Sequence, residues 1–168
     1  MSIFGRKAMN MWKKIKPYVI SILIALGVGG LSSFLTRSNM SIYEDIIKPP
    51  LAPPMLLFPI VWGILFVLMG ISSAIVYTRK DDLKEETSSA LKTYALNLIV
   101  NFFWTIIFFN MQAFLFAFIW LVILWIIILI MILKFKKISP IAAYLQIPYL
   151  VWVTFAGYLT LAIFILNR

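Results

Sequence analysis

The stretch KPPLAPPMLLFPIVW, residues 48–62, contains five of the chain's eight prolines and runs into an apolar segment that ends near Tyr77. A proline fixes its own φ and disfavours helical geometry in the residue before it, so residues 48–54 should form a stiff, non-helical loop. Pro59 falls within the first turns of the helix that follows, where its missing N–H costs little. The stretch therefore predicts a rigid loop above the mouth of an aromatic-rich helix, which is a natural ceiling for a pocket.

The composition of the 168-residue chain is that of a membrane protein. It is 63% hydrophobic and 12% charged, with a mean hydropathy of +1.01, whereas a soluble domain is about half apolar and a quarter charged. Five apolar stretches come close to the length of about 20 residues that a helix needs to cross a bilayer. They run over about 17–35, 55–77, 90–109, 113–133 and 140–166. Because the polar gaps are short, we predict an all-α membrane protein, a five-transmembrane-helix bundle that forms a single domain over residues 1–168.

The basic residues predict how the chain lies in the membrane. With five spans, Arg37, Lys48 and Arg168 fall on one side, and the other twelve Lys and Arg residues fall on the opposite side. An excess of this kind is typical of cytoplasmic ends. It predicts the N-terminus in the cytoplasm, the C-terminus and the proline-rich loop outside, and insertion into a bacterial cell membrane. The net charge of +9 is then a consequence of topology, and no nucleic acid partner is expected.

The first span allows two interpretations. A basic segment followed by an apolar run and small residues resembles a cleavable signal peptide, but the run is long and no clean A-x-A site follows it. Ser21, Ala25, Gly29 and Ser33 instead recur at every fourth residue, where small side chains let helices approach closely. Packing inside the bundle and a seam between two copies both fit this pattern. The fourth span, nearly uniform in Ile, Leu and Phe, is expected to be the most lipid-exposed helix or an oligomer face.

Several reaction classes are excluded by missing residues. The chain has no cysteine and no histidine, which removes thiolate nucleophiles, the usual metal ligands and the usual general base. Its six acidic residues all lie in polar connecting stretches. We therefore predict no metal site and no cofactor, and conventional acid–base or nucleophilic catalysis lacks the residues it needs.

Polar and aromatic residues, together with one small residue, converge at one depth near the predicted outer side. They are Tyr43, Trp62, Asn101, Trp104, Trp152 and Tyr158, with Ala156 as the small residue. Their arrangement predicts an apolar, aromatic cavity suited to a flat hydrophobic ligand. Two alternatives stay open. Tryptophan and tyrosine also form belts at membrane interfaces, and Asn97 and Asn101, which share a helix face, could make an interhelical hydrogen bond instead of contacting a ligand.

A kink is predicted in the fifth span. Pro148 removes a hydrogen bond within the helix and crowds the carbonyl group four residues earlier, so the kink should lie near Tyr144. Trp152 lies one turn beyond this proline. We expect its indole to meet that of Trp62 beneath the loop, so that the two rings enclose a slot for a planar ligand.

Three ordered motifs resemble those of a known family. The stretch from Tyr43 to Trp62, with its paired prolines, looks like the first-loop signature of the translocator protein family, also called TspO or tryptophan-rich sensory protein. Residues 101–109, NFFWTIIFF, and residues 139–156, SPIAAYLQIPYLVWVTFA, resemble the family's third-helix and fifth-helix motifs. The resemblance implies a five-helix bundle, commonly a homodimer in contact with membrane lipid, that binds porphyrins and other flat hydrophobic ligands beneath the first loop.

The resemblance also implies roles for individual residues. The tryptophans that some bacterial members use in light- and oxygen-dependent protoporphyrin breakdown match Trp62 and Trp152. The family's ligand-contact positions match Tyr43, Phe66, Asn101, Trp104, Pro148 and Ala156. The chain departs from animal members after Tyr158, where the next basic residue is Arg168, so their weak cholesterol-recognition pattern is missing.

Three functions remain as alternatives. The first is an integral membrane tetrapyrrole-binding protein that acts as a sensor or carrier. The second is an enzyme that degrades protoporphyrin with light and oxygen, with Trp62 and Trp152 as redox relays. The third is a non-catalytic membrane scaffold.

Overall fold

The computed structural model describes the backbone of residues 3–168 and the side chains of residues 11–168, and every regular element in this range is a helix. The elements are α1 (Ile3–Thr36), the short η1 (Arg37–Asn39), α2 (Ile42–Asp45), α3 (Leu57–Tyr77), α4 (Lys84–Thr105), its π-helical continuation η2 (Ile106–Asn110), α5 (Phe114–Ile138), α6 (Pro140–Tyr144) and α7 (Ile147–Leu166). Among the residues that the structure describes, five helical stretches are long and apolar enough to cross a membrane: Met11–Asn39, Leu57–Tyr77, Lys84–Asn110, Phe114–Ile138 and Pro140–Leu166. The predicted all-α, five-span fold is confirmed, while the orientation of the termini stays a prediction.

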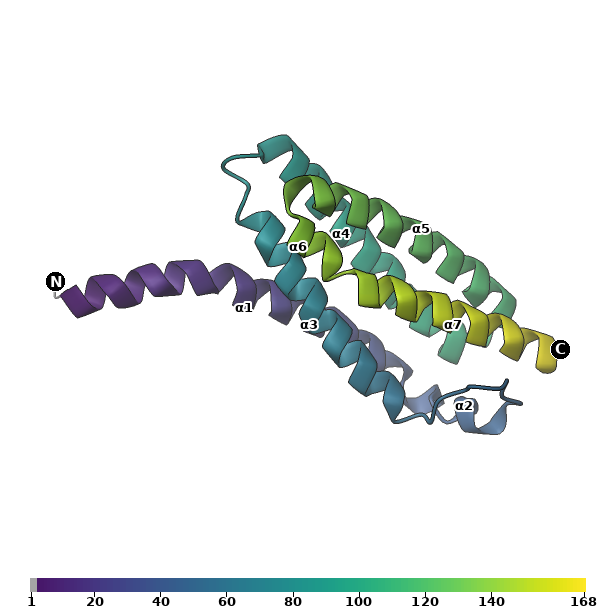
Figure 1. The fold of residues 1–168 in the computed structure, drawn as a ribbon. Coiled ribbons are helices and arrows are strands. Elements are labelled where there is room, and N and C mark those ends of the chain that lie inside the picture. The colour runs from purple at the N-terminus through teal and green to yellow at the C-terminus, as the bar shows by residue number, and fades with distance from the viewer. Residues whose placement is uncertain (1–2) are drawn as a thin grey trace.

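The spans are arranged as a ring (Figure 1). α1 packs along α3, α3 contacts α6, α6 and α7 pack against α5, α5 packs along α4, and α4 contacts α1. One end of the bundle, here called the loop end, carries α2, the loop of residues 46–56 and the C-terminus. The other end, here called the basic end, carries the α3–α4 and α5–α6 connections. The first part of α1 extends beyond the other helices at the basic end.

Small residues bring α1 and α3 together. A Cβ atom added to Gly70 would lie 2.5 Å from the Cα of Ile22, and one added to Gly29 would overlap the Phe66 ring. Ala25, one turn before Gly29, is fully buried. Part of the small-residue face of the first span therefore packs inside the bundle, which is one of the two interpretations that the sequence left open.

The most exposed span is α1 and not α5. In the most apolar window of each span, 17% of the residues are buried in α1 and 28% in α5. The expectation that the fourth span would be the most exposed is wrong because α5 lies between α4 and α7. Two indoles of α5 also form hydrogen bonds with these neighbouring helices. Trp120 Nε1 donates to the Val100 carbonyl of α4 at 2.7 Å, and Trp125 Nε1 donates to Thr154 Oγ1 of α7 at 2.9 Å.

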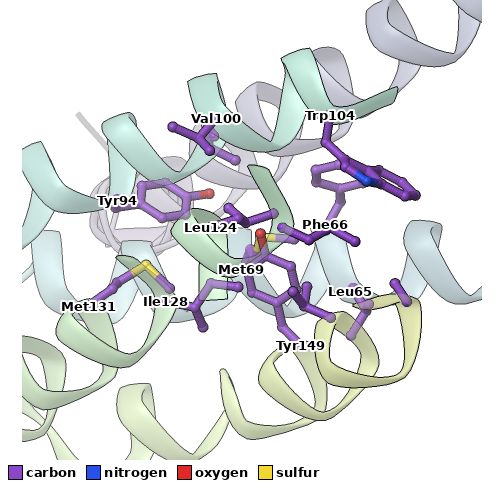
Figure 2. Packing of buried hydrophobic residues seen from close by; sticks show 14 of the residues in the cluster. Leu65, Phe66, Met69, Tyr94, Val100, Trp104, Leu124, Ile128, Met131 and Tyr149 are labelled. Atoms are coloured by element: carbon purple, nitrogen blue, oxygen red, sulfur yellow. The ribbon is translucent and has the colours of Figure 1, made fainter. Parts of the chain in front are cut away.

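The centre of the bundle contains a polar link within an apolar core. Met69 of α3 and Leu124 of α5 are fully buried in this core, close to the ring of Tyr149 from α7 (Figure 2). Asn101 Nδ2 donates to the Tyr149 hydroxyl at 2.8 Å, and this hydroxyl donates to Asn97 Oδ1 at 2.9 Å. A hydrogen bond between membrane helices contributes about 0.6 to 2 kcal/mol. The two asparagines of α4 thus hold α7 through Tyr149. This is the interhelical hydrogen bonding that the sequence offered as the alternative to ligand contact.

The loop of residues 46–56 is non-helical, as its prolines predict. Side chains form hydrogen bonds of 2.9 to 3.0 Å with the backbone of every third loop residue. Asn167 bonds to Ile47, Tyr158 to Pro50 and Tyr43 to Pro53. Asn167 makes two of these bonds, since its Nδ2 donates to the Ile47 carbonyl and its Oδ1 accepts from the Ile47 N–H. The loop is therefore fixed to both α2 and the end of α7.

The fifth span is broken where the proline predicts. α6 ends at Tyr144 and α7 begins at Ile147, and Figure 1 shows them as separate helices. Pro148 has no N–H to donate to the Tyr144 carbonyl, so the helix cannot continue through this turn. The kink expected near Tyr144 is confirmed.

Candidate ligand-binding site

An apolar cavity of about 290 Å³ lies between α1, α3 and α4 near the loop end. Its lining consists of Leu26, Gly29, Gly30, Ser32, Ser33 and Thr36 from α1, Met40, then Phe58, Pro59, Trp62, Gly63 and Phe66 from α3, and Asn101, Trp104, Thr105 and Phe109 from α4 and η2. None of these side chains is ionisable. The volume lies near the lower limit of ligand pockets, which is about 300 Å³.

Trp62 is at the centre of the aromatic wall of this cavity. Its ring centroid lies 5.7 Å from that of Phe66 and 6.1 Å from that of Trp104. Trp62 and Phe66 are four residues apart on α3 and therefore share a face, while Trp104 comes from the facing turn of α4. Tyr149 packs edge-on against Trp62 at 6.0 Å and closes the side towards α7. Such a wall of tilted rings offers π-faces to a flat aromatic ligand.

The α1 wall supplies hydroxyl groups, and sequence reasoning missed it. Ser32 Oγ and Thr105 Oγ1 are hydrogen-bonded at 2.5 Å, and Thr36 Oγ1 donates to the Ser32 carbonyl at 3.0 Å. The sequence feature that could have indicated this wall is the helix face that carries Gly29, Ser32, Ser33 and Thr36. Small and hydroxylated residues at this spacing indicate a close approach between helices, but they do not indicate which helix is approached or that a gap remains.

The predicted site residues are divided between two cavities. Four of them line the main cavity: Trp62, Phe66, Asn101 and Trp104. Tyr43 and Ala156 instead line a second cavity of only about 20 Å³, which shares Phe58, Trp104 and Phe109 with the main one. The two cavities are therefore neighbours that are separated by aromatic side chains.

Two predicted residues line neither cavity. Pro148 is exposed on the outside of α7. Trp152 packs against Phe58 at 6.0 Å between ring centroids, one aromatic layer away from the main cavity. The structure differs here from the expected meeting of Trp62 and Trp152, because Tyr149 occupies the inner face of α7 beside Trp62.

The proline-rich loop lines neither cavity. None of residues 47–54 is in the lining of the main or the second cavity, and the loop is linked to the second only through Tyr43, which lines it and whose hydroxyl donates to the Pro53 carbonyl at 3.0 Å. Burial raises the pKa of Tyr43, which keeps its hydroxyl a neutral donor to this bond. At the loop end the main cavity is bounded by Met40, Phe58 and Pro59.

The main cavity opens sideways between α1 and α3. Four residues that line the cavity are also exposed on the outside of the bundle. Leu26 is 37% exposed, and the others are Gly30, Ser33 and Pro59. A Cβ atom added to Gly30 or to Gly63 would meet no atom within 4 Å. In a bilayer this opening would face lipid, so an apolar ligand has a route into the cavity that avoids water.

Hydrogen-bond donors for a ligand are few. The Asn101 amide nitrogen already donates to Tyr149. Trp104 Nε1 is buried and has no partner among the described residues. A ligand in this cavity would therefore be held mainly by its rings, and the polar groups within reach are the Trp104 N–H and the hydroxyls of α1.

Known proteins resemble this chain along most of its length. A profile of the TspO/MBR family matches residues 20–166, which extend from inside the first span to the end of α7. The chain is 38% identical over 158 residues to the tryptophan-rich protein TspO of Chlorobaculum tepidum, covering 94% of this chain and 99% of that protein. It is 34% identical over 128 residues to protein CrtK of Rhodobacter capsulatus, covering 74% and 78%. It is 31% identical over 117 residues to the translocator protein of Ovis aries, covering 70% and 69%.

Proposed function

Because the chain belongs to the TspO/MBR family and is an integral membrane protein with five spans, we propose that its main cavity binds a tetrapyrrole such as protoporphyrin, as a sensor or carrier of that ligand. The bacterial relatives agree with the bacterial membrane expected from the sequence. The name of the sheep relative, translocator protein, supports carriage for this chain.

The observation that carries the proposal is the aromatic wall. Trp62, Phe66 and Trp104 line one apolar cavity with centroids 5.7 to 6.1 Å apart. Offset aromatic contacts contribute about 0.5 to 1.5 kcal/mol each beyond the burial of area. A planar macrocycle can make several of them at once, and no charged group would be left buried without a partner in the lining.

The size of the cavity indicates how such a ligand would lie. A volume of about 290 Å³ holds part of a tetrapyrrole, and the opening between α1 and α3 leaves room for the rest to extend towards lipid. The carboxylates of protoporphyrin would then remain near the opening and the hydroxyls of α1, where they need not be buried as charges.

The test is a titration of the full-length protein with protoporphyrin, followed by quenching of tryptophan fluorescence. Gly63→Leu places a side chain in the cavity, since space beside Gly63 is open. It should weaken binding at least about tenfold, which is 1.4 kcal/mol. Gly27→Leu is the matched control, because Gly27 also has open space but does not line the cavity.

Two outcomes contradict the proposal: saturable binding that Gly63→Leu leaves unchanged, or no saturable binding at all. The same titration in light and in darkness addresses the breakdown alternative. A new bilin-like absorbance that needs light, oxygen and both Trp62 and Trp152 would favour the enzyme over the sensor or carrier.

A further inference from the structure

A second large hollow lies at the basic end, remote from the aromatic cavity. It is a cleft of about 460 Å³ between the first part of α1 and the end of α3. Its ionisable and aromatic lining residues are Lys13, Lys14, Tyr18, Tyr77, Lys80 and Asp81. The aromatic cavity and this cleft share no residue.

The packing of α1 on α3 fixes the depth of the cleft. Gly70 of α3 lies against Ile22 of α1. The two helices are consecutive spans and run in opposite directions, so Tyr77, seven residues after Gly70, lies level with Ile15, seven residues before Ile22. This is about 10 Å along the helix axis. The cleft is therefore where α3 ends as an apolar span, which is the depth of lipid headgroups.

The charge of the cleft is positive. Three ammonium groups, from Lys13, Lys14 and Lys80, face one carboxylate, from Asp81. Lys80 Nζ donates to the Tyr77 hydroxyl at 2.9 Å and lies 4.5 Å from the centre of its ring. This hydrogen bond raises the pKa of Lys80, so the ammonium keeps its charge at neutral pH. An anion that enters the cleft would meet cationic and phenolic donors together.

The face of α1 that is turned away from the cleft is apolar. Ile15, Val19, Ile20 and Leu23 are 39% to 63% exposed, and their spacing places them on the opposite side of the helix from the α1 residues that line the cleft. Since α1 is the least buried span, this face is open to acyl chains. A cationic cleft at headgroup depth, on a helix whose other face is apolar and exposed, matches an amphiphile whose chains stay in the bilayer, whereas a free phosphate ion would use only the cleft.

We propose that this cleft binds the headgroup of an anionic phospholipid, with the phosphate between the lysines of α1 and Lys80 and the acyl chains in the bilayer around α1. Cationic residues at a membrane surface attract anionic lipids, and several together make the attraction selective. The lining combines residues of α1, the end of α3 and the α3–α4 connection around one hollow, which distinguishes the cleft from isolated surface lysines. The proposal does not depend on the ligand of the aromatic cavity.

The test measures lipid selectivity of the full-length protein in phosphatidylcholine vesicles that contain a small amount of spin-labelled phosphatidylglycerol or, in a parallel sample, spin-labelled phosphatidylcholine. The triple variant Lys13→Gln, Lys14→Gln, Lys80→Gln removes three positive charges from the cleft. The control Lys84→Gln, Lys136→Gln, Lys137→Gln removes three exposed positive charges from the same end of the bundle, outside the cleft. We expect the preference for phosphatidylglycerol to fall about tenfold in the cleft variant and much less in the control.

Equal loss in both triple variants would mean a diffuse electrostatic effect and would overturn the proposal, as would an unchanged preference in the cleft variant. Millimolar glycerol phosphate and inorganic phosphate form a further arm. We expect them not to displace the lipid, and displacement would assign the cleft to a soluble phosphate instead. If the triple variant does not fold, the single variant Lys80→Gln is compared with Lys84→Gln instead. We then expect the preference for phosphatidylglycerol to fall about threefold in Lys80→Gln and much less in Lys84→Gln.

Discussion

The Trp62 indole packs edge-on against the Tyr149 ring at 6.0 Å between centroids, and through this contact α7 reaches the wall of the aromatic cavity. The Tyr149 hydroxyl is at the same time held by Asn97 and Asn101 of α4. One side chain thus joins α3, α4 and α7 at the point where the cavity begins. Trp62 therefore packs against a side chain whose hydroxyl belongs to a buried polar link.

Tyr149→Phe should destabilise the bundle while it preserves the packing against Trp62. The change removes both hydrogen bonds and leaves two buried amides without their phenol partner, at a cost of about 1 to 3 kcal/mol. For a chain of this length we expect the melting temperature in detergent to fall by about 2 to 4 °C for each kcal/mol. Tyr158→Phe is the control, since the half-exposed Tyr158 loses a single bond to the Pro50 carbonyl. Equal losses in the two variants would contradict a special role for the buried link.

Trp62→Ala and Trp152→Ala should differ in their effect on protoporphyrin binding. Trp62 lines the main cavity, so its loss should weaken binding about tenfold. Trp152 lies one aromatic layer away behind Phe58, and we expect a change of less than about threefold. The measurement is the titration described above, monitored through the porphyrin absorbance because the tryptophan signal itself changes. A larger loss from Trp152→Ala would show that the ligand occupies the space beneath the loop instead.

The outline of this fold was predictable from the sequence for clear physical reasons. Apolar runs of membrane-spanning length leave few alternatives to a helix bundle, because unpaired backbone groups are too costly in lipid. Proline acts locally, so the non-helical loop and the break before Pro148 could be placed to within a residue or two. The aromatic and amide residues of α3 and α4 could be placed because their spacing puts them on shared faces.

The orientation of α7 and the contribution of α1 could not be predicted in the same way. Lipid is as apolar as the core of the bundle, so hydrophobicity does not indicate which face of a membrane helix is buried. On α7 the buried face carries Tyr149, Val153, Ala156 and Thr160. Trp152 lies beside this face and is only partly buried, although its side chain is as apolar as those of the buried residues. The exposure of α5 was predicted wrongly for the same reason, since the apolar residues of its uniform sequence fit protein and lipid contacts equally well.

Asn167→Ala should loosen the proline-rich loop. Both of its amide atoms bond the backbone of Ile47, and each exposed bond contributes about 0.5 kcal/mol or more. We expect faster hydrogen exchange at the Ile47 N–H with little change in melting temperature. Asn39→Ala is a matched control, because Asn39 makes an exposed bond to Asn110 at the same end of the bundle. Exchange at Ile47 that is unaffected by Asn167→Ala would mean that the prolines alone hold the loop.

Gly70→Ala should separate α1 from α3 and disturb the cavity from a distance. The new Cβ atom would lie 2.5 Å from the Cα of Ile22, and a backbone atom cannot move aside as a flexible side chain can. Overpacking of this kind costs about 1 to 3 kcal/mol. Because α1 forms one wall of the cavity, we also expect weaker protoporphyrin binding although Gly70 does not line it.

Gly157→Ala separates this steric effect from helix propensity. A Cβ atom added to Gly157 would meet no atom within 4 Å, so the variant should be neutral or gain up to about 1 kcal/mol from the better helix former. Thermal unfolding and protoporphyrin titration of the two variants provide the comparison. If Gly70→Ala behaves as Gly157→Ala does, the close contact with Ile22 does not hold α1 in place. The wall that α1 contributes to the cavity would then depend on its contacts with α4, which include the Ser32–Thr105 hydrogen bond.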